Sequence, residues 1–378
     1  MKPIKPFFFD MTEEEINQFT ERSAKILRSG TLILGEHTVE FERAFAEFIG
    51  AKHAISVSSG STALEILLRL KKVAGKTVLV PTNTNFATVA SVIRAGGHVQ
   101  YLDMDKAFFA PSLLMVREAV QRPPLISSAP IVGLVWVHIG GVISSEFPEI
   151  VQYCHQQELF VLEDDAHAHG SQLNGVKAGN LADGGAFSFF PTKVMTTCEG
   201  GMITTNNDEE QYLALSYRNQ GKRGMSYGGL HHDLGNSSRL PEISAVLGLI
   251  QLKKLPGMLE KRAALHARIT DQLNRKGLDY VSTQHMDVAS HYKFITLIPP
   301  GRKTSAIKEG LTKNNIFAGG AVYELPCHRQ PVFEGICAGE TYPGADRWCP
   351  SHLCPPLTTG MTEAEADFVG ESLVKLLA

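Results

Sequence analysis

The sequence predicts an α/β protein: a mostly parallel sheet flanked by helices, followed by a smaller domain. Short apolar runs alternate with helical patterns until about Gln251, as expected for strands joined by crossover helices. These runs are apolar at odd and even positions, so both faces of the sheet should be covered. Beyond Gln251 a long charged helix and a proline-rich stretch replace the alternation. We therefore predict a large domain over residues 1–252 and a small α+β domain over residues 253–378.

The elements can be placed in chain order. The expected strands are apolar runs at residues 54–57, 77–80, 99–102, 131–137, 160–163, 185–188 and 201–205. The expected helices of the large domain cover residues 13–28, 38–48, 60–72, 86–94, 111–121 and 243–252. Pro111 and Ser112 favour a helix start, because proline suits a first turn and serine can cap one. The small domain should hold helices at 253–274, at 304–314 and from residue 362, with an apolar segment at 292–298.

Composition excludes several classes of protein. The chain has 378 residues, of which 43% are hydrophobic, enough for a large core. The net charge of −3 argues against a nucleic-acid partner. The longest apolar runs, such as 131–139, are too short to cross a bilayer, and residues 1–12 hold no apolar core of signal-peptide length. We expect a cytoplasmic enzyme with no membrane contact.

The cysteines give a weak metal signal. Cys349 and Cys354 flank His352, which invites a zinc site. Nearby prolines and the lack of a second ligand pair favour ordinary thiols instead, so no metal is expected.

Lys193 is the first candidate for chemistry. It follows an apolar strand and a proline in the segment Phe189-Phe-Pro-Thr-Lys-Val, with Glu199-Gly-Gly shortly after. A partly desolvated setting lowers the pKa of a lysine, and the neutral amine can attack a carbonyl. The alternative is a lysine at a strand end that reaches water.

A second candidate segment is Glu163-Asp-Asp-Ala-His-Ala-His169, which follows a buried strand. Ligands of open α/β sheets bind at the carboxyl ends of strands. A carboxylate there could pair with a protonated ring nitrogen of a heteroaromatic cofactor, or the Asp and His residues could bind a metal. Consecutive residues of a strand point to opposite faces, so Glu163, Asp164 and Asp165 are not expected to share one metal.

Three polar segments complete the pattern. Ser58-Ser-Gly-Ser-Thr62 precedes a helix, where backbone N–H groups could bind a phosphate that Gly60 lets come close, although an ordinary helix cap would look the same. It lacks the spacing of a Walker loop. The other two are Pro81-Thr-Asn-Thr-Asn-Phe-Ala-Thr88 and Gly235-Asn-Ser-Ser-Arg-Leu-Pro-Glu242.

In this order, the segments resemble the DegT/DnrJ/EryC1/StrS family of PLP-dependent sugar aminotransferases. The resemblance runs almost end to end, from Ser29-Gly-Thr-Leu-Ile-Leu-Gly35 through the Ser188, Lys193 and Glu199-Gly-Gly pattern to Tyr323-Glu-Leu-Pro. It implies the aspartate aminotransferase fold (fold type I) and pyridoxal 5′-phosphate as cofactor. It also implies a homodimer with shared active sites, and amine transfer from glutamate or glutamine to the carbonyl of a sugar or sugar-like acceptor.

The resemblance also implies roles for single residues. Lys193 would form the Schiff base with the cofactor and shuttle protons, and Asp164 would pair with its pyridine nitrogen. Ser188 and the backbone of Ser61 and Thr62, next to Gly60, would hold the phosphate. Asn236 and Arg239 would reach the phosphate or substrate in the active site of the neighbouring subunit.

This chain departs from the family at three places. His167 stands where the family usually has glutamine at the cofactor's phenolic oxygen. Asn85 stands where an aromatic ring usually stacks on the cofactor, with Phe86 one position later. The family's cross-subunit asparagine falls at Ser237, one position after Asn236. Family members with the Asn-Thr-Asn-Phe-Ala-Thr sequence act on other carbonyl compounds too, including free acid sugars and small phosphorylated ketones.

Three other functions compete with the transaminase. A PLP-dependent sugar dehydrase is one, but such relatives replace the lysine by histidine. A non-catalytic PLP-binding regulator is another, but it would need a DNA-binding module for which the chain has no spare segment. A metal hydrolase built on His167, His169 and the acids would leave Lys193 without a role.

Overall fold

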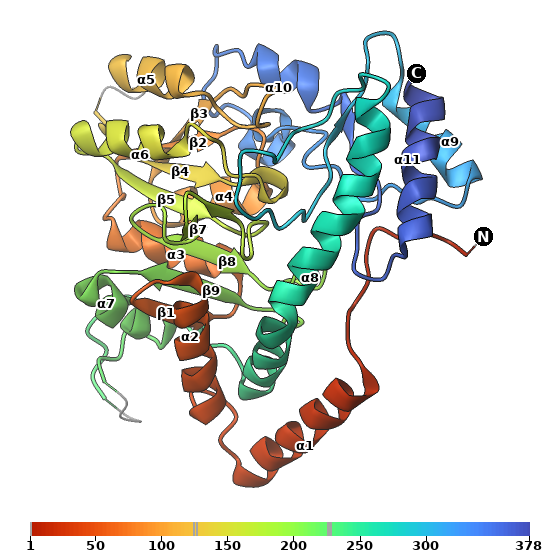
Figure 1. Ribbon diagram of the computed structural model, residues 1–378. Coiled ribbons are helices and arrows are strands. Elements are labelled where there is room, and N and C mark those ends of the chain that lie inside the picture. The colour runs from red at the N-terminus through yellow and green to blue at the C-terminus, as the bar shows by residue number, and fades with distance from the viewer. Residues whose placement is uncertain (1, 124, 126–127, 225–228) are drawn as a thin grey trace.

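A seven-stranded sheet forms the centre of the computed structural model, which describes residues 2–123, 125, 128–224 and 229–378 (Figure 1). Its strands are β1 (His53–Val57), β2 (Thr77–Pro81), β3 (His98–Leu102), β4 (Ile131–Val137), β5 (Phe160–Asp164), β8 (Gly185–Ser188) and β9 (Gly201–Thr205). The order is β1-β9-β8-β5-β4-β2-β3. All pairs from β3 to β8 are parallel, and β9 is antiparallel to both of its neighbours. The predicted α/β fold with a mostly parallel sheet is confirmed.

Helices cover both faces of this sheet. In β2, Val78 and Val80 belong to one apolar cluster and Leu79 to another, because alternate side chains of a strand point to opposite faces. The helices packed around the sheet are α2 (Glu36–Ile49), α3 (Gly60–Leu70), α4 (Phe86–Arg94), α5 (Leu113–Gln121), α6 (Phe147–Gln156) and α7 (Asp208–Arg218). Two short strands, β6 (Gln172–Leu173) and β7 (Val176–Lys177), form a separate hairpin. The apolar runs are therefore buried on both sides, as their composition predicts.

One continuous helix, α8 (Glu242–Asn274), joins the sheet to the C-terminal region (Figure 1). The prediction of separate helices at 243–252 and 253–274 was wrong, and the predicted domain boundary falls inside α8. Pro256 removes a backbone hydrogen bond, but Leu252, Leu255 and Leu259 around it are buried against α2 and the sheet. This burial offsets the cost of the proline, so the helix continues through it.

The C-terminal region has its own apolar core, and the start of the chain belongs to it. Ile4 lies in the same cluster as Leu311 and Leu373 and forms a bridge with Ile316. The elements of this region are β10 (Thr296–Leu297), α9 (Thr304–Lys313), α10 (Pro343–Trp348), β11 (His352–Leu353) and α11 (Glu363–Leu377), with 3-10 turns at 327–329 and 331–333. A small α+β unit therefore packs beside the sheet.

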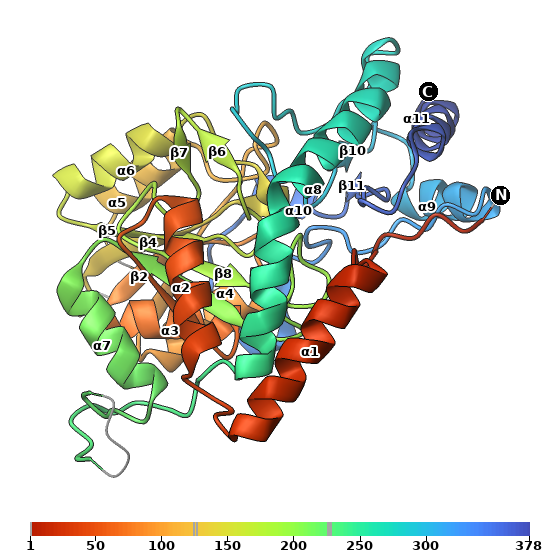
Figure 2. The ribbon, with the colours of Figure 1, turned by 60° about the horizontal axis from the view of Figure 1, so that its bottom comes forward.

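The first helix, α1 (Glu13–Ser29), lies along the first half of α8 (Figure 2). Ile26 packs there against Val246 and Ile250. Within the described part of the chain, no helix combines the length and the apolar character needed to cross a membrane.

Candidate active site

The candidate site is a cavity of about 360 Å³ where β5 and β8 end and α3 begins. The predicted site residues that line it are Gly60, Ser61, Asn85, Asp164, His167, Ser188 and Lys193. The other residues that line it are Ser59, Leu64, Ala87, Val137, Ala166, Phe190, Glu199 and Tyr323. The parallel strands bring these distant segments together, because their carboxyl ends meet at one edge of the sheet.

Lys193 lies in the turn that follows β8, where its backbone N–H donates to the carbonyl of Phe190 at 3.0 Å. Its side chain is half-buried, and Nζ lies 5.0 Å from the centre of the Tyr292 ring. Burial lowers the pKa of this amine to about 8, with a further contribution from the charge of Lys293, while Asp164 acts in the opposite direction. A substantial fraction of Lys193 is therefore neutral near pH 8 and can act as a nucleophile.

Asp164, the last residue of β5, presents a buried and oriented carboxylate. Its Oδ2 accepts a hydrogen bond from Thr88 Oγ1 at 2.7 Å, and Oδ1 accepts one from the backbone N–H of Ala166 at 3.2 Å. Thr88 gives its single O–H to Asp164, so the 2.8 Å contact between Thr84 Oγ1 and Thr88 Oγ1 must be donated by Thr84. Burial raises the pKa of Asp164, and these hydrogen bonds and the charge of Lys193 oppose the shift.

The hydrogen bonds around His167 determine its tautomer. The backbone N–H of Gly140 donates to Nδ1 at 3.2 Å, so Nδ1 carries no proton. Burial holds the pKa of His167 well below its ordinary value, with the charge of Lys193 acting in the same direction, so the ring is neutral and its proton is on Nε2. This Nε2 lies 3.4 Å from Tyr323 Oη, and the ring stacks on Tyr292. His167 therefore offers one N–H donor, as the family's usual glutamine would.

The start of α3 has the features of a phosphate site. Ser59 caps the helix, since its Oγ accepts the backbone N–H of Thr62 at 3.2 Å. That N–H is thus already used, and Thr62 is not among the residues that line the cavity. The remaining polar groups are Ser61 and the hydroxyl of Ser188. A Cβ on Gly60 would lie 2.8 Å from the Cβ of Ser188, so glycine is needed for close packing of α3 on β8.

The other predicted residues lie outside the cavity. Phe86 is 46% exposed and its ring stacks on Phe333, at 5.4 Å between centroids. Asn236 is exposed, and Arg239 donates from Nη1 to the side chain of Asn219 at 2.8 Å. Neither Asn236 nor Arg239 lines the cavity of its own chain.

Sequence reasoning missed several residues that the fold brings to the site. Tyr323 was noted only as the start of a motif, although its position beside His167 makes it part of the wall. Tyr292 and Lys293 begin the segment at 292–298, which was predicted only as an apolar run. Thr88 lies within the Asn-Thr-Asn-Phe-Ala-Thr segment, but its hydrogen bond to Asp164 exists only in the folded chain.

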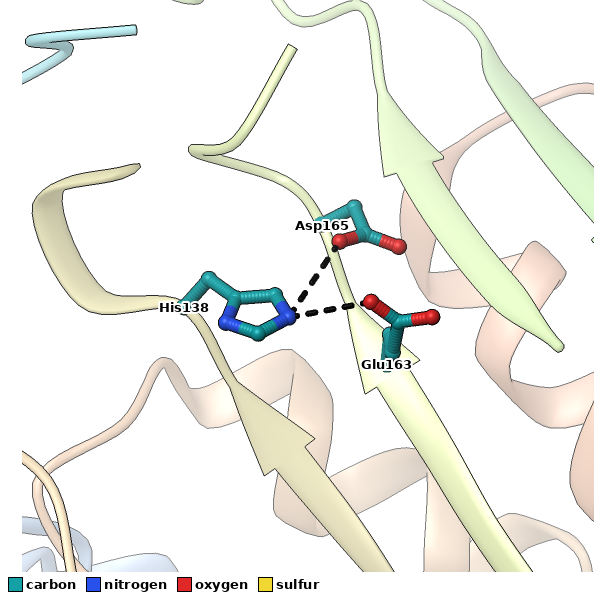
Figure 3. Close-up of side chains that lie close together, drawn as sticks. All are labelled: His138, Glu163 and Asp165. Atoms are coloured by element: carbon teal, nitrogen blue, oxygen red, sulfur yellow. Dashed lines mark hydrogen bonds and ion pairs between the residues drawn. The ribbon is translucent and has the colours of Figure 1, made fainter. Parts of the chain in front are cut away.

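Behind the cavity wall lies a buried cluster of His138, Glu163 and Asp165, the only group of metal-ligand type among the described residues (Figure 3). His138 Nε2 lies 3.0 Å from Glu163 Oε2 and 3.8 Å from Asp165 Oδ1. All three side chains are fully buried. The carboxylate of Glu163 also accepts backbone N–H groups at 2.9–3.0 Å from Gly179, Leu181 and Ala182. The side-chain oxygens of Glu163 are therefore already occupied by backbone hydrogen-bond donors.

The three consecutive acids separate as the alternation of a strand predicts. Asp164 lines the cavity, whereas Glu163 and Asp165 lie together on the other face. Burial raises the pKa of Asp165 well above its ordinary value, and the charges of Glu163 and Asp164 add to this. The group near Glu163 includes neither His167 nor His169, the ligands expected for a metal hydrolase.

Comparison with known proteins decides the family. The sequence model of the DegT/DnrJ/EryC1/StrS aminotransferase family matches residues 11–374. This chain belongs to that family. It is 31% identical to GDP-perosamine synthase of Caulobacter vibrioides over 91% of each chain. Its fold matches that of a family member from Brucella abortus with a TM-score of 0.89, at 22% identity over 97% of this chain and 96% of that one.

The family assignment makes the enzyme a PLP-dependent aminotransferase and confirms the predicted fold type and cofactor. A Streptococcus pneumoniae protein of the same fold has been solved in a PLP form, with a TM-score of 0.86 at 23% identity over 99% of this chain and 98% of that one. The residues of the cavity fit this cofactor. Lys193 has an amine of lowered pKa, Asp164 is oriented by Thr88, and the start of α3 with Ser188 could take an anionic group.

Proposed function

We propose that this DegT-family enzyme transfers an amino group from glutamate or glutamine to the carbonyl of a sugar or sugar-like acceptor. The observation that carries the proposal is the meeting of a lysine of lowered pKa with an oriented carboxylate in one cavity. The GDP-perosamine synthase of Caulobacter vibrioides supports a sugar-type acceptor. Nucleotide-linked sugars, keto-acid sugars and small phosphorylated ketones all remain within this class.

Each role follows from the contacts of the residue. PLP, when bound, would supply an electron sink. Lys193 would hold the cofactor covalently and would then carry a proton on Nζ. Asp164, oriented by Thr88, would keep the ring nitrogen protonated, and His167 would donate from Nε2 to the phenolic oxygen. Ser61 and Ser188 would hold the phosphate at the start of α3.

The half-reaction with the amino donor tests this function. PLP-loaded enzyme should lose the visible absorbance of its lysine-bound cofactor when glutamate or glutamine is added, and one equivalent of the matching 2-oxo acid should form. A regulator that only binds the cofactor would form no acid, and release of an aminated product after addition of a carbonyl acceptor would distinguish the transaminase from a dehydrase. Absence of the 2-oxo acid with every amino acid offered would refute the proposal.

A shared active site in a homodimer is part of this proposal. Arg239 and Asn236 lie outside the cavity of their own chain, on a segment that carries exposed apolar side chains. Leu230 and Leu234 are 77% and 83% exposed, which favours their burial by another chain. In a two-fold dimer, Arg239 could reach the partner's phosphate site with its forked donors. The location of the enzyme in the cytoplasm stays a prediction.

Complementation between inactive chains should reveal the shared site. We expect a mixture of Lys193→Ala and Arg239→Ala chains to regain activity after subunit exchange, up to about a quarter of the wild-type rate for random mixing. Mixed dimers contain one site in which both residues are intact. The measurement is amine transfer before and after exchange, with each variant shown to be inactive alone. If Arg239 serves its own chain, verified exchange should restore nothing.

A further inference from the structure

A second cavity of about 380 Å³ adjoins the cofactor cavity. The residues common to both are Asn85, His167, Phe190, Lys193 and Tyr323. Its other walls come from Pro6, Phe7, Thr192, Tyr292, Lys293 and residues 319–322. These walls hold two amines, Lys193 and Lys293, and no aspartate or glutamate is among the described residues that form them. The space that a substrate would occupy next to the cofactor is therefore electropositive.

Lys293 is a cation without an ion pair to any carboxylate of the described residues. Its side chain is half-buried, and Nζ donates to the carbonyl of Gly319 at 3.0 Å and lies 5.1 Å from the centre of the Tyr292 ring. Burial lowers the pKa of this amine, because a charge removed from water without a partner is costly. An anionic group that enters the cavity would relieve this cost.

The backbone that carries Lys293 is firmly held. Arg262, buried on α8, donates to the carbonyls of Ser290, His291 and Tyr292 at 2.6–3.2 Å. The N–H of Lys293 donates to the carbonyl of Gly140 at 3.2 Å. The amine is thus positioned before any substrate arrives, which reduces the entropy lost on binding.

We infer that Lys293 binds a carboxylate of a substrate in this second cavity. This inference rests on the proposed function, because amine transfer requires both substrates to enter the space beside Lys193, where the cofactor would be held. Glutamate and glutamine both carry a carboxylate, and an acidic sugar acceptor would carry one as well. Lys293 thereby selects acidic substrates, while Lys193, in the same cavity, serves the cofactor and the proton transfer.

Binding of unreactive acids to the PLP-loaded enzyme tests the site. Glutarate represents the amino donor, and gluconate represents an acid sugar that has no carbonyl to aminate. Calorimetry should give dissociation constants about tenfold or more higher for Lys293→Gln than for wild type, because the carboxylate loses its charged partner. Glutamine keeps an N–H donor for the Gly319 carbonyl. Lys293→Arg keeps the charge and should bind within about threefold of wild type.

The pattern of results identifies the source of the carboxylate. If Lys293→Gln weakens the binding of glutarate alone, Lys293 binds the amino donor. If it weakens the binding of gluconate alone, Lys293 binds the acceptor. If it weakens the binding of both acids, Lys293 binds both substrates. The control is Lys313→Gln, which removes an exposed lysine on α9 and should leave both constants unchanged. Equal binding by wild type and Lys293→Gln, or no binding of either acid to wild type, overturns the inference.

Failure of the proposed function would look different. If Lys293→Gln loses glutarate binding but wild type forms no 2-oxo acid from any amino donor, the anion site stands and the transaminase proposal fails. If wild type transfers the amine but both acids bind equally well to Lys293→Gln, the transaminase proposal stands and the anion site fails. Melting temperatures of all variants, measured with bound PLP, show whether the fold is intact.

Discussion

Replacement of Lys193 by alanine should lower the rate of amine transfer by at least about 10³-fold, because the chain loses both its covalent attachment point and its proton carrier. Burial gives the amine of Lys193 a pKa of about 8, so it is the group in the cavity best prepared to attack a carbonyl near neutral pH. The variant should still fold, since the side chain is only half-buried. Steady-state rates and melting curves measure both effects, with the exposed Lys253→Ala as control.

Mass spectrometry locates the covalent bond directly. After borohydride reduction, the added mass of the cofactor should lie on the peptide that contains Lys193. Lys293 is the other amine of the adjoining cavity and hence the natural competitor. Label on Lys293, or on any lysine other than Lys193, would end the assignment.

Replacement of Asp164 by asparagine should lower kcat by about 10²-fold or more while PLP stays bound, because an amide cannot keep the ring nitrogen protonated. The phosphate site at the start of α3 and the bond to Lys193 do not involve this carboxylate. Cofactor content from absorbance and kcat from amine transfer separate the two effects. Thr88→Val, which removes the O–H that orients Asp164, should cause a smaller loss of the same kind.

The neighbouring acid gives a matched control for Asp164. Asp165 lies on the other face with His138 and Glu163 (Figure 3), and burial raises its pKa well above the ordinary value. Asp165→Asn changes a side chain of similar size that does not line the cavity, so kcat should stay within about threefold of wild type. A large loss in Asp165→Asn together with a normal rate in Asp164→Asn would reverse the two roles.

Local pattern determined much of the fold. Strands β4, β8 and β9 and helix α4 have the predicted bounds, because a run of apolar residues or a helical periodicity is complete within a few residues. The continuity of α8 through Pro256 could not be predicted this way. Proline breaks a helix by local rules, and only packing against distant elements overcomes that preference.

The sequence by itself determined the fold class, the family and the candidate residues Lys193, Asp164 and His167, since each lies in a short and distinctive segment. Only the tertiary structure showed which hydrogen bonds orient Asp164 and which tautomer His167 adopts. It alone placed Tyr292 and Lys293 beside Lys193. The physical reason is that protonation and charge pairing depend on burial and on partners from distant segments, and these exist only after the chain has folded.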